Sequence, residues 1–246
     1  LGEWRAFVAS ADGRVLSKEE TLFSMHEHGD EVSAKGRVYM SNPMRDSNIV
    51  DVDLEHLDGS GRLNGTYVKV SNGKNAPIQA TDGDFRVEAD STHFGEVSLY
   101  YHIDKIHSNL KQIEPGFTGM DWKIPVETHS KGSFFMKNDN AFYSPMKKAL
   151  FILDPSKLND LHLEAAVAYH EYHHAVTDNI VPNLRSQEGR AMHEGYSDYF
   201  ACRLTNDPQI GEWALKPINR PHMRDLRSTR KYPDDLTCNL HRCRLS

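Results

Sequence analysis

The amino-acid sequence predicts an α+β fold, with a β-rich N-terminal lobe followed by an α-helical lobe. Segments in the first part of the chain alternate between apolar and polar side chains, as strands do. Residues 159–205 instead carry apolar side chains at three- and four-residue steps, as helices do. Strands and helices that are separated along a chain are typical of α+β proteins. We therefore expect a β-rich lobe with one helix over residues 23–158 and a helical lobe over residues 159–246.

Two N-terminal segments show the alternation of strands. Residues 3–16 alternate, turn at Asp12-Gly13 and resume an apolar pattern, and residues 48–57 alternate again. Further on, Asn72-Gly73 predicts a tight turn. The apolar residues of the alternating stretches are Trp4, Ala6, Val8, Val15, Val50, Val52 and Leu54.

One helix is predicted inside the β-rich lobe, over residues 94–113. Its apolar side chains recur at helical steps, and Pro115 and Gly116 end the pattern. Residues 134–153 favour extended structure again. The aromatic residues that this segment offers to a core are Phe134, Phe135, Phe142 and Phe151.

Two helices are predicted in the second lobe. The first covers about residues 161–177, with Asn159 or Asp160 as its N-terminal cap and Pro182 beyond its end. The second covers about residues 188–204 and ends at Asp207-Pro208.

The composition is that of a globular protein, with 38% apolar and 26% charged residues. A formal net charge of −6 argues against nucleic acid as a partner, because phosphate binding requires a basic surface. No apolar run approaches the roughly 18–20 residues of a membrane span, so no membrane partner is expected. The chain starts at Leu1 without a visible targeting segment, and its three cysteines do not form a disulfide framework.

A metal site is predicted on the first helix of the second lobe. His170 and His174 are four positions apart, so they lie on one helical face, where two imidazoles can bind one tetrahedral ion such as zinc. Glu171 stands beside this pair, where the general base for a metal-bound water is needed. Since the chain has 14 histidines, a polar helix with a chance histidine pattern is the alternative.

A third ligand is needed, because catalytic zinc sites use three protein ligands and a water. Glu194 follows His174 by 20 positions on the second helix, and Asp198 lies one turn further on the same face. Asp198 is placed to accept a hydrogen bond from a ligand histidine and so orient its ring. Taken alone, both acids would be ordinary surface residues; combined with the first motif they favour a zinc site.

These motifs resemble the thermolysin group of zinc metallopeptidases, and "HEGYSDYF" (residues 193–200) is closest to its fungalysin-like branch. The resemblance implies a thermolysin-like fold and one zinc ion bound by His170, His174 and Glu194, with Glu171 as general base and Asp198 behind a ligand histidine. It also implies an extracellular protein with protein or peptide substrates, and it allows calcium, for which no ligands can be assigned.

Weaker similarities concern substrate binding. "NAFY" (residues 140–143) resembles the family's edge strand, which implies that the Asn140 side chain and the Ala141 carbonyl bind substrate. Arg227, in Leu-Arg-Ser, is similar to an arginine that contacts the substrate carbonyl, and His241 is a faint candidate for stabilising the tetrahedral intermediate. Residues 1–22 resemble the last hairpin of a propeptide.

The sequence also departs from the family pattern. No tyrosine occurs in residues 175–193, where thermolysin has one that stabilises the oxyanion. The family's helical lobe continues further than this chain does, so we expect the lobe to be incomplete.

The function predicted from the sequence is that of a zinc-dependent endopeptidase. A gluzincin aminopeptidase is the nearest alternative, although residues 175–193 form a spacer one residue longer than in that group, and its Gly-x-Met-Glu-Asn strand is missing. An inactive zinc-binding fragment is the other alternative, because an incomplete lobe could bind zinc without catalysis.

Overall fold

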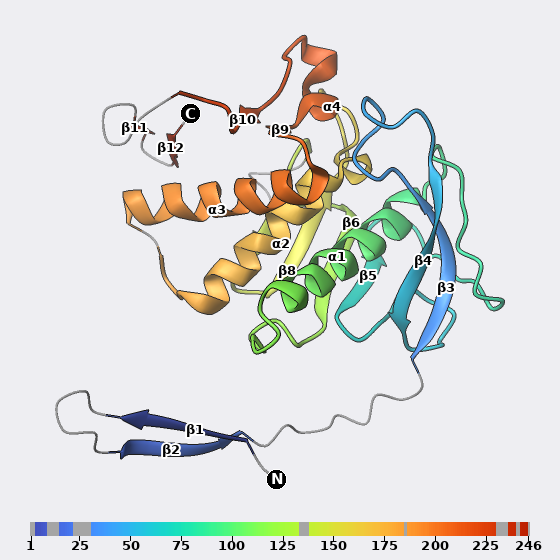
Figure 1. Cartoon of the computed structure of the whole chain (residues 1–246). Coiled ribbons are helices and arrows are strands. Elements are labelled where there is room, and N and C mark those ends of the chain that lie inside the picture. The colour runs from blue at the N-terminus through green and yellow to red at the C-terminus, as the bar shows by residue number, and fades with distance from the viewer. Residues whose placement is uncertain are drawn as a thin grey trace.

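The protein is described here by a computed structural model (Figure 1). It describes residues 31–132, 138–184 and 186–229, together with the backbone of four further strands. Two of these, β1 (Glu3–Val8) and β2 (Val15–Thr21), pair antiparallel. The predicted N-terminal hairpin is thereby confirmed, while its turn at Asp12-Gly13 lies outside the described residues. The other two, β11 (Leu236–Asn239) and β12 (Arg242–Leu245), also pair antiparallel.

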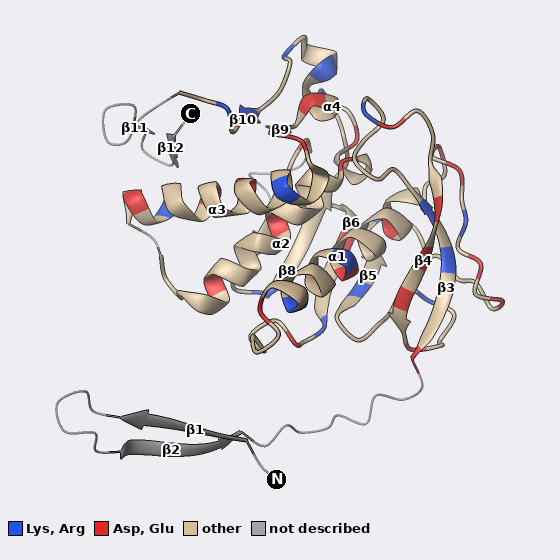
Figure 2. Cartoon of the chain, in the orientation of Figure 1, with Lys and Arg blue, Asp and Glu red and all other residues tan. Residues whose placement is uncertain are grey.

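A two-stranded ribbon opens the main body. β3 (Val32–Val38) pairs antiparallel with β4 (Val50–Leu57). The alternation predicted for β4 is confirmed in part, because Leu54 is buried and Val52 half-buried, whereas Val50 is exposed. Opposite charges face each other on the exposed side, where Lys35 Nζ lies 2.6 Å from Asp53 Oδ1 (Figure 2). Gly36 allows a helix to pack closely on the other side, since a Cβ there would lie 2.9 Å from Val97 Cγ1.

The central sheet has four strands in the order β5-β6-β8-β7. β5 (Val68–Asn72), β6 (Ile124–Ser130) and β8 (Ala149–Leu153) are parallel, while β7 (Ala141–Ser144) pairs antiparallel with β8 at the edge. The α+β fold class is confirmed, and β5 is joined to its parallel neighbour β6 by a crossover that contains a helix.

The tight turn at Asn72-Gly73 is confirmed, but it leads away from the sheet. The Asn72 Oδ1 atom accepts hydrogen bonds from the backbone N–H groups of Lys74 and Asn75. The chain then continues to α1 (Phe94–Ile113), which has the bounds that the sequence predicts. Residues 133–137, with Phe134 and Phe135, lie outside the described residues.

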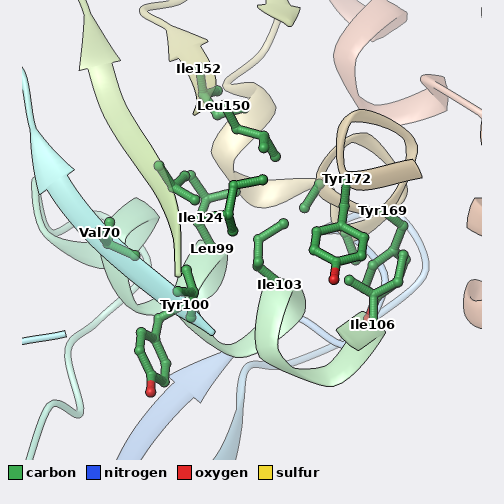
Figure 3. Close-up of a cluster of buried hydrophobic side chains, with 14 of the residues drawn as sticks. Val70, Leu99, Tyr100, Ile103, Ile106, Ile124, Leu150, Ile152, Tyr169 and Tyr172 are labelled. Carbon is green, nitrogen blue, oxygen red and sulfur yellow. The ribbon is translucent and has the colours of Figure 1, made fainter. Parts of the chain in front are cut away.

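The hydrophobic core lies between the sheet and two helices, α1 and α2 (Ala165–Ile180). Figure 3 shows Ile103 and Ile106 of α1 packed near Tyr169 and Tyr172 of α2, with Ile124 of β6 on the sheet side. Burial of each such side chain contributes about 1.5–3 kcal/mol to the free energy of unfolding. This cluster therefore fixes the helix that carries His170 and His174.

Two buried hydrogen bonds join α1 to α2. His102 Nδ1 lies 2.8 Å from Tyr169 Oη, and His107 Nδ1 lies 2.9 Å from Tyr172 Oη. Burial lowers the pKa of His102 to about 3 and that of His107 to about 4, so both imidazoles are neutral at physiological pH. Each bond satisfies a polar group that would otherwise be costly to bury.

The predicted helix over residues 161–177 is wrong at its start. A separate 3₁₀ turn, η1 (Leu161–Leu163), is capped by Asp160, whose side chain accepts a hydrogen bond from the His162 N–H group. Glu164 is extended and interrupts the helix, because its buried carboxylate accepts hydrogen bonds from the N–H groups of Gly211 and Ala214, at 2.7 and 3.1 Å. α2 begins after this break.

The second predicted helix is confirmed as α3 (Gln187–Thr205), capped by Ser186, whose hydroxyl accepts a hydrogen bond from the Gly189 N–H group. After it follow β9 (Gln209–Ile210), α4 (Glu212–Leu215), η2 (Lys216–Ile218) and β10 (Arg224–Asp225), and β9 pairs antiparallel with β10. Among the described residues, every helix is too short or too polar to span a bilayer.

Removing core volume at α1 tests the packing. Ile103 is fully buried, whereas Ile113 of the same helix is 46% exposed. We expect Ile103→Ala to lower the free energy of unfolding by about 2–5 kcal/mol, through lost burial and a residual cavity. The matched change Ile113→Ala should alter it by less than about 0.5 kcal/mol. Urea denaturation of both variants measures the difference; equal effects would contradict the packing.

The carboxyl group of Glu164 makes stability depend on pH. Burial, followed by the neighbouring Glu212 carboxylate, raises the pKa of Glu164 from 4.5 to about 7. Between these values the folded chain keeps a proton that the unfolded chain releases, so the free energy of unfolding falls as pH rises through this window. One pKa unit corresponds to about 1.4 kcal/mol, so the full loss is about 3 kcal/mol.

Glu164→Gln removes this titration. We expect the variant to be less stable than the parent at low pH, because one amide oxygen cannot replace the two carboxyl oxygens that accept hydrogen bonds from backbone N–H groups. Its free energy of unfolding should not show the additional decrease toward neutral pH that Glu164 causes. Denaturation of both proteins at a series of pH values gives the two slopes. Parallel slopes would show that another group causes the decline.

Candidate metal centre

The two predicted helices bring the predicted ligands together. His170 and His174 lie one turn apart on α2, and α3, which carries Glu194, lies beside it (Figure 1). His170 Nε2 lies 3.5 Å from Glu194 Oε2, and His174 Nε2 lies 3.7 Å from Glu194 Oε1. One ligand atom of each residue lies within 4.8 Å of the other two. The three side chains therefore converge on one point.

This donor set fits a zinc ion. Zinc bonds of about 2.0–2.2 Å to nitrogen and oxygen place neighbouring ligand atoms of a tetrahedron about 3.3–3.6 Å apart. The separations of 3.5 and 3.7 Å from Glu194 to the two imidazoles are close to these values. Two imidazoles and one carboxylate also leave a fourth position for water or substrate, as in catalytic rather than structural zinc sites.

The charges around the ligands favour a cation. Burial would lower the pKa of His170, but the carboxylates of Asp198 and Glu194 outweigh it and raise this pKa to about 9. Burial likewise opposes ionisation of Glu194, yet the neighbouring histidines hold its pKa well below the usual range. Burial lowers the pKa of His174 strongly, which keeps this imidazole neutral and able to bind a metal.

Asp198 lies behind His170, where the sequence places it. Its Oδ1 atom is 2.8 Å from His170 Nδ1, so the ring presents Nε2 to Glu194. The other carboxylate oxygen, Oδ2, is 2.6 Å from Arg224 Nε. Arg224 is brought here from β10 and also approaches Glu194, with Nη1 3.8 Å from Oε2.

Arg224 was not among the residues singled out in the sequence. The sequence could have indicated a basic residue that pairs with the buried carboxylate of Asp198. Whether Arg224 or Arg227 takes this position depends on the pairing of β9 with β10, which the sequence does not show. In the structure the guanidinium of Arg227 lies 2.5 Å from Asp225 Oδ2, is mostly exposed and does not line the cavity at the metal site. His241 lies outside the described residues, and calcium remains a prediction without assigned ligands.

Glu171 is buried next to the ligands. Its Oε2 atom accepts a hydrogen bond of 2.9 Å from the backbone N–H group of Tyr143 in the edge strand β7. Burial raises the pKa of Glu171, which suits a carboxylate that must accept a proton. The edge strand thus holds the predicted base in position.

A cavity of about 550 Å³ lies over the site. Its lining includes His170, Glu171, His174 and Glu194, together with Asn140 and Ala141 at the start of β7. Apolar side chains form much of its remaining wall: Leu158, Leu161, Val167, Ile210 and Met223. The cavity is large enough for part of an extended peptide, and the substrate residues predicted on β7 therefore share one cavity with the predicted metal ligands.

Among the described residues, one other group of potential ligands converges, formed by Glu55, His56 and Asp104. His56 Nδ1 lies 2.9 and 3.0 Å from the two carboxylate oxygens of Asp104. The single imidazole is therefore already paired with a carboxylate, and the group lacks the pair of histidines that the site on α2 has.

Comparison with known proteins identifies the family. The fungalysin metallopeptidase (M36) family model matches residues 52–242. No curated protein sequence matches the chain. Among solved structures, the precursor of protealysin, a metalloproteinase from Serratia proteamaculans, is similar with 16% sequence identity and a TM-score of 0.47. That match covers 65% of this chain and 56% of the protealysin precursor, so the chain spans little more than half of that structure's length. Because the family model covers most of the sequence, including all the predicted metal ligands, the chain belongs to the fungalysin metallopeptidase family.

Proposed function

We propose that this chain is the zinc-binding part of an endopeptidase that hydrolyses peptide bonds. The observation that carries the proposal is the convergence of His170, His174 and Glu194 beside the buried carboxylate of Glu171. Family membership supports a metallopeptidase, while the substrate, the reaction and its residues are proposals for this chain.

His170, His174 and Glu194 would hold the zinc ion. When bound, zinc supplies a Lewis acid that acidifies water and polarises a carbonyl group. Asp198 keeps the Nδ1 side of His170 occupied at 2.8 Å, and Arg224 compensates the charge of Asp198 at 2.6 Å. Together these two residues orient a ligand and limit the excess negative charge of three carboxylates in one site.

Glu171 acts as the general base. Its Oε2 atom is held by the Tyr143 N–H group, which leaves Oε1 to accept a proton from the attacking water. Glu171 then delivers this proton to the nitrogen of the leaving amine. Burial, which raises its pKa, keeps the protonated form accessible between these two transfers.

The edge strand β7 binds the substrate backbone. The carbonyl of Asn140 accepts a hydrogen bond from Leu153 N–H, whereas the Tyr143 N–H group points to Glu171. Since backbone groups of successive residues point to opposite sides of a strand, the Ala141 carbonyl faces the cavity side with Tyr143. An extended peptide can therefore pair with Ala141 as an added strand, and the Asn140 side chain would bind the same peptide.

Arg224, which lines the cavity, takes the role of donor to the substrate carbonyl that the sequence suggested for Arg227. A guanidinium that already contacts Asp198 is fixed in orientation, and this lowers the entropy cost of each new hydrogen bond. An extracellular location is part of the proposal and rests on the resemblance to the family.

Metal analysis of the purified chain tests the ligand set. We expect about one zinc ion per chain in the parent protein and a loss of tight binding in His174→Ala, because two remaining ligands cannot hold the ion. His56→Ala serves as the matched control and should keep its zinc, since His56 belongs to the other group of potential ligands. Loss of zinc in both variants, or in neither, would remove the basis of the proposal.

Substitution of the base tests the mechanism. Glu171→Gln should keep its zinc but lower kcat for a peptide substrate by about 100- to 10,000-fold, because the amide cannot accept a proton. The substrate is a peptide with a blocked N-terminus, which an aminopeptidase cannot cleave. Unchanged turnover in the variant would refute the role of Glu171. Zinc binding without cleavage by the parent chain would instead identify a zinc-binding fragment without activity.

A further inference from the structure

We propose that the cavity at the metal site selects peptides with acidic side chains near the cleaved bond, through Arg190 and Arg220. The inference rests on the proposed function and adds a substrate class to it. Both arginines line the cavity, and within the described part of the chain neither side chain has a hydrogen-bond or ion-pair partner. Figure 2 shows basic segments on α3 and along the segment that carries α4 and β10.

Arg190 lies one helical turn before Glu194 on α3, so it shares a face with the metal ligand. It lines the main cavity and also a side pocket of about 340 Å³, which shares Pro145 and His193 with the main cavity. Arg190 therefore lines both cavities. Asp178 lines the side pocket as well but forms no ion pair with Arg190 within 4 Å.

Arg220 approaches the cavity from the loop after η2. Its backbone N–H group donates a hydrogen bond to the Leu215 carbonyl, which fixes the loop, while its side chain is exposed. Two cavity residues that flank it in the chain, Ala214 and Met223, are apolar, and Arg224 follows Met223. An acidic side chain bound against this wall would find Arg220 as its cationic partner.

The carboxylates of the cavity are already engaged. Asp139 accepts hydrogen bonds from the backbone N–H groups of residues 156–158. Glu194 belongs to the metal site, and Glu171 is held by Tyr143 N–H. In the main cavity the two arginines are therefore the charges that remain for a substrate side chain, although the chain as a whole carries a formal charge of −6.

Arginine suits a carboxylate ligand because its planar guanidinium offers two parallel N–H donors. An exposed ion pair contributes little, so each arginine should improve binding of an acidic peptide by about two- to fivefold. The effect should weaken with added salt, since partly exposed charges are screened.

The test uses the zinc-loaded full chain with Glu171→Gln, which binds substrate without turning it over. The probes are N-terminally blocked, fluorescently labelled peptides that differ only in carrying Glu, Gln or Lys on both sides of the expected cleavage point. We expect the Glu peptide to bind at least about fourfold more tightly than the Gln peptide at low salt, and the Lys peptide to bind most weakly.

Arg190→Gln and Arg220→Gln should each reduce the preference for Glu over Gln. Arg203→Gln is the matched control, because Arg203 lies on α3 but outside the cavity, paired with Asn109. Arg190→Glu should shift the preference toward the Lys peptide, which a general loss of structure could not produce. Equal binding of Glu and Gln peptides, or an equal effect of Arg203→Gln, would overturn the inference.

Cleavage by the parent chain separates this inference from the proposed function. Cleavage of Glu and Gln peptides at equal kcat/KM would overturn the acidic preference and leave the peptidase intact. A zinc-loaded chain that neither binds nor cleaves any of the peptides would overturn both.

Discussion

The contact of Asp198 with both His170 and Arg224 is the interaction on which the proposed metal centre depends. One carboxylate lies 2.8 Å from the ligand imidazole of α2 and 2.6 Å from the guanidinium of β10. It therefore joins three elements that are distant in sequence, namely α2, α3 and β10. A buried carboxylate is costly unless both of its oxygens are compensated, so these elements are held in one arrangement. The ligand geometry follows from that arrangement.

On the side away from Asp198, helix α2 is held by hydrogen bonds between uncharged side chains. The hydroxyls of Tyr169 and Tyr172 bond to the buried imidazoles of His102 and His107 on α1, inside the apolar cluster of Figure 3. One face of α2 thus makes directional bonds in the core, and the other face carries the proposed metal ligands. Because hydrogen bonds require defined distances and angles, they set the rotation of the helix more sharply than apolar packing alone would.

The edge strand β7 links the cavity to the proposed general base. Its Tyr143 N–H group holds Glu171, and the same side of the strand faces the cavity. A peptide bound to β7 as proposed would thereby be aligned with Glu171 by one rigid element. The parallel neighbours β6 and β8 support this strand from within the sheet.

The sequence by itself determined the helices and the approach of the proposed metal ligands to one another, because both depend on short-range spacing. α1 and α3 have nearly their predicted bounds, and the steps between His170, His174 and Glu194 follow from helical periodicity. The tertiary structure alone decided which arginine reaches Asp198, where α2 begins and that β6 lies parallel to β5. Arg224, Glu164 and β6 are each placed by partners far away in the chain. No local sequence pattern encodes these long-range interactions, because they form only when folding brings the distant backbone groups and charges together.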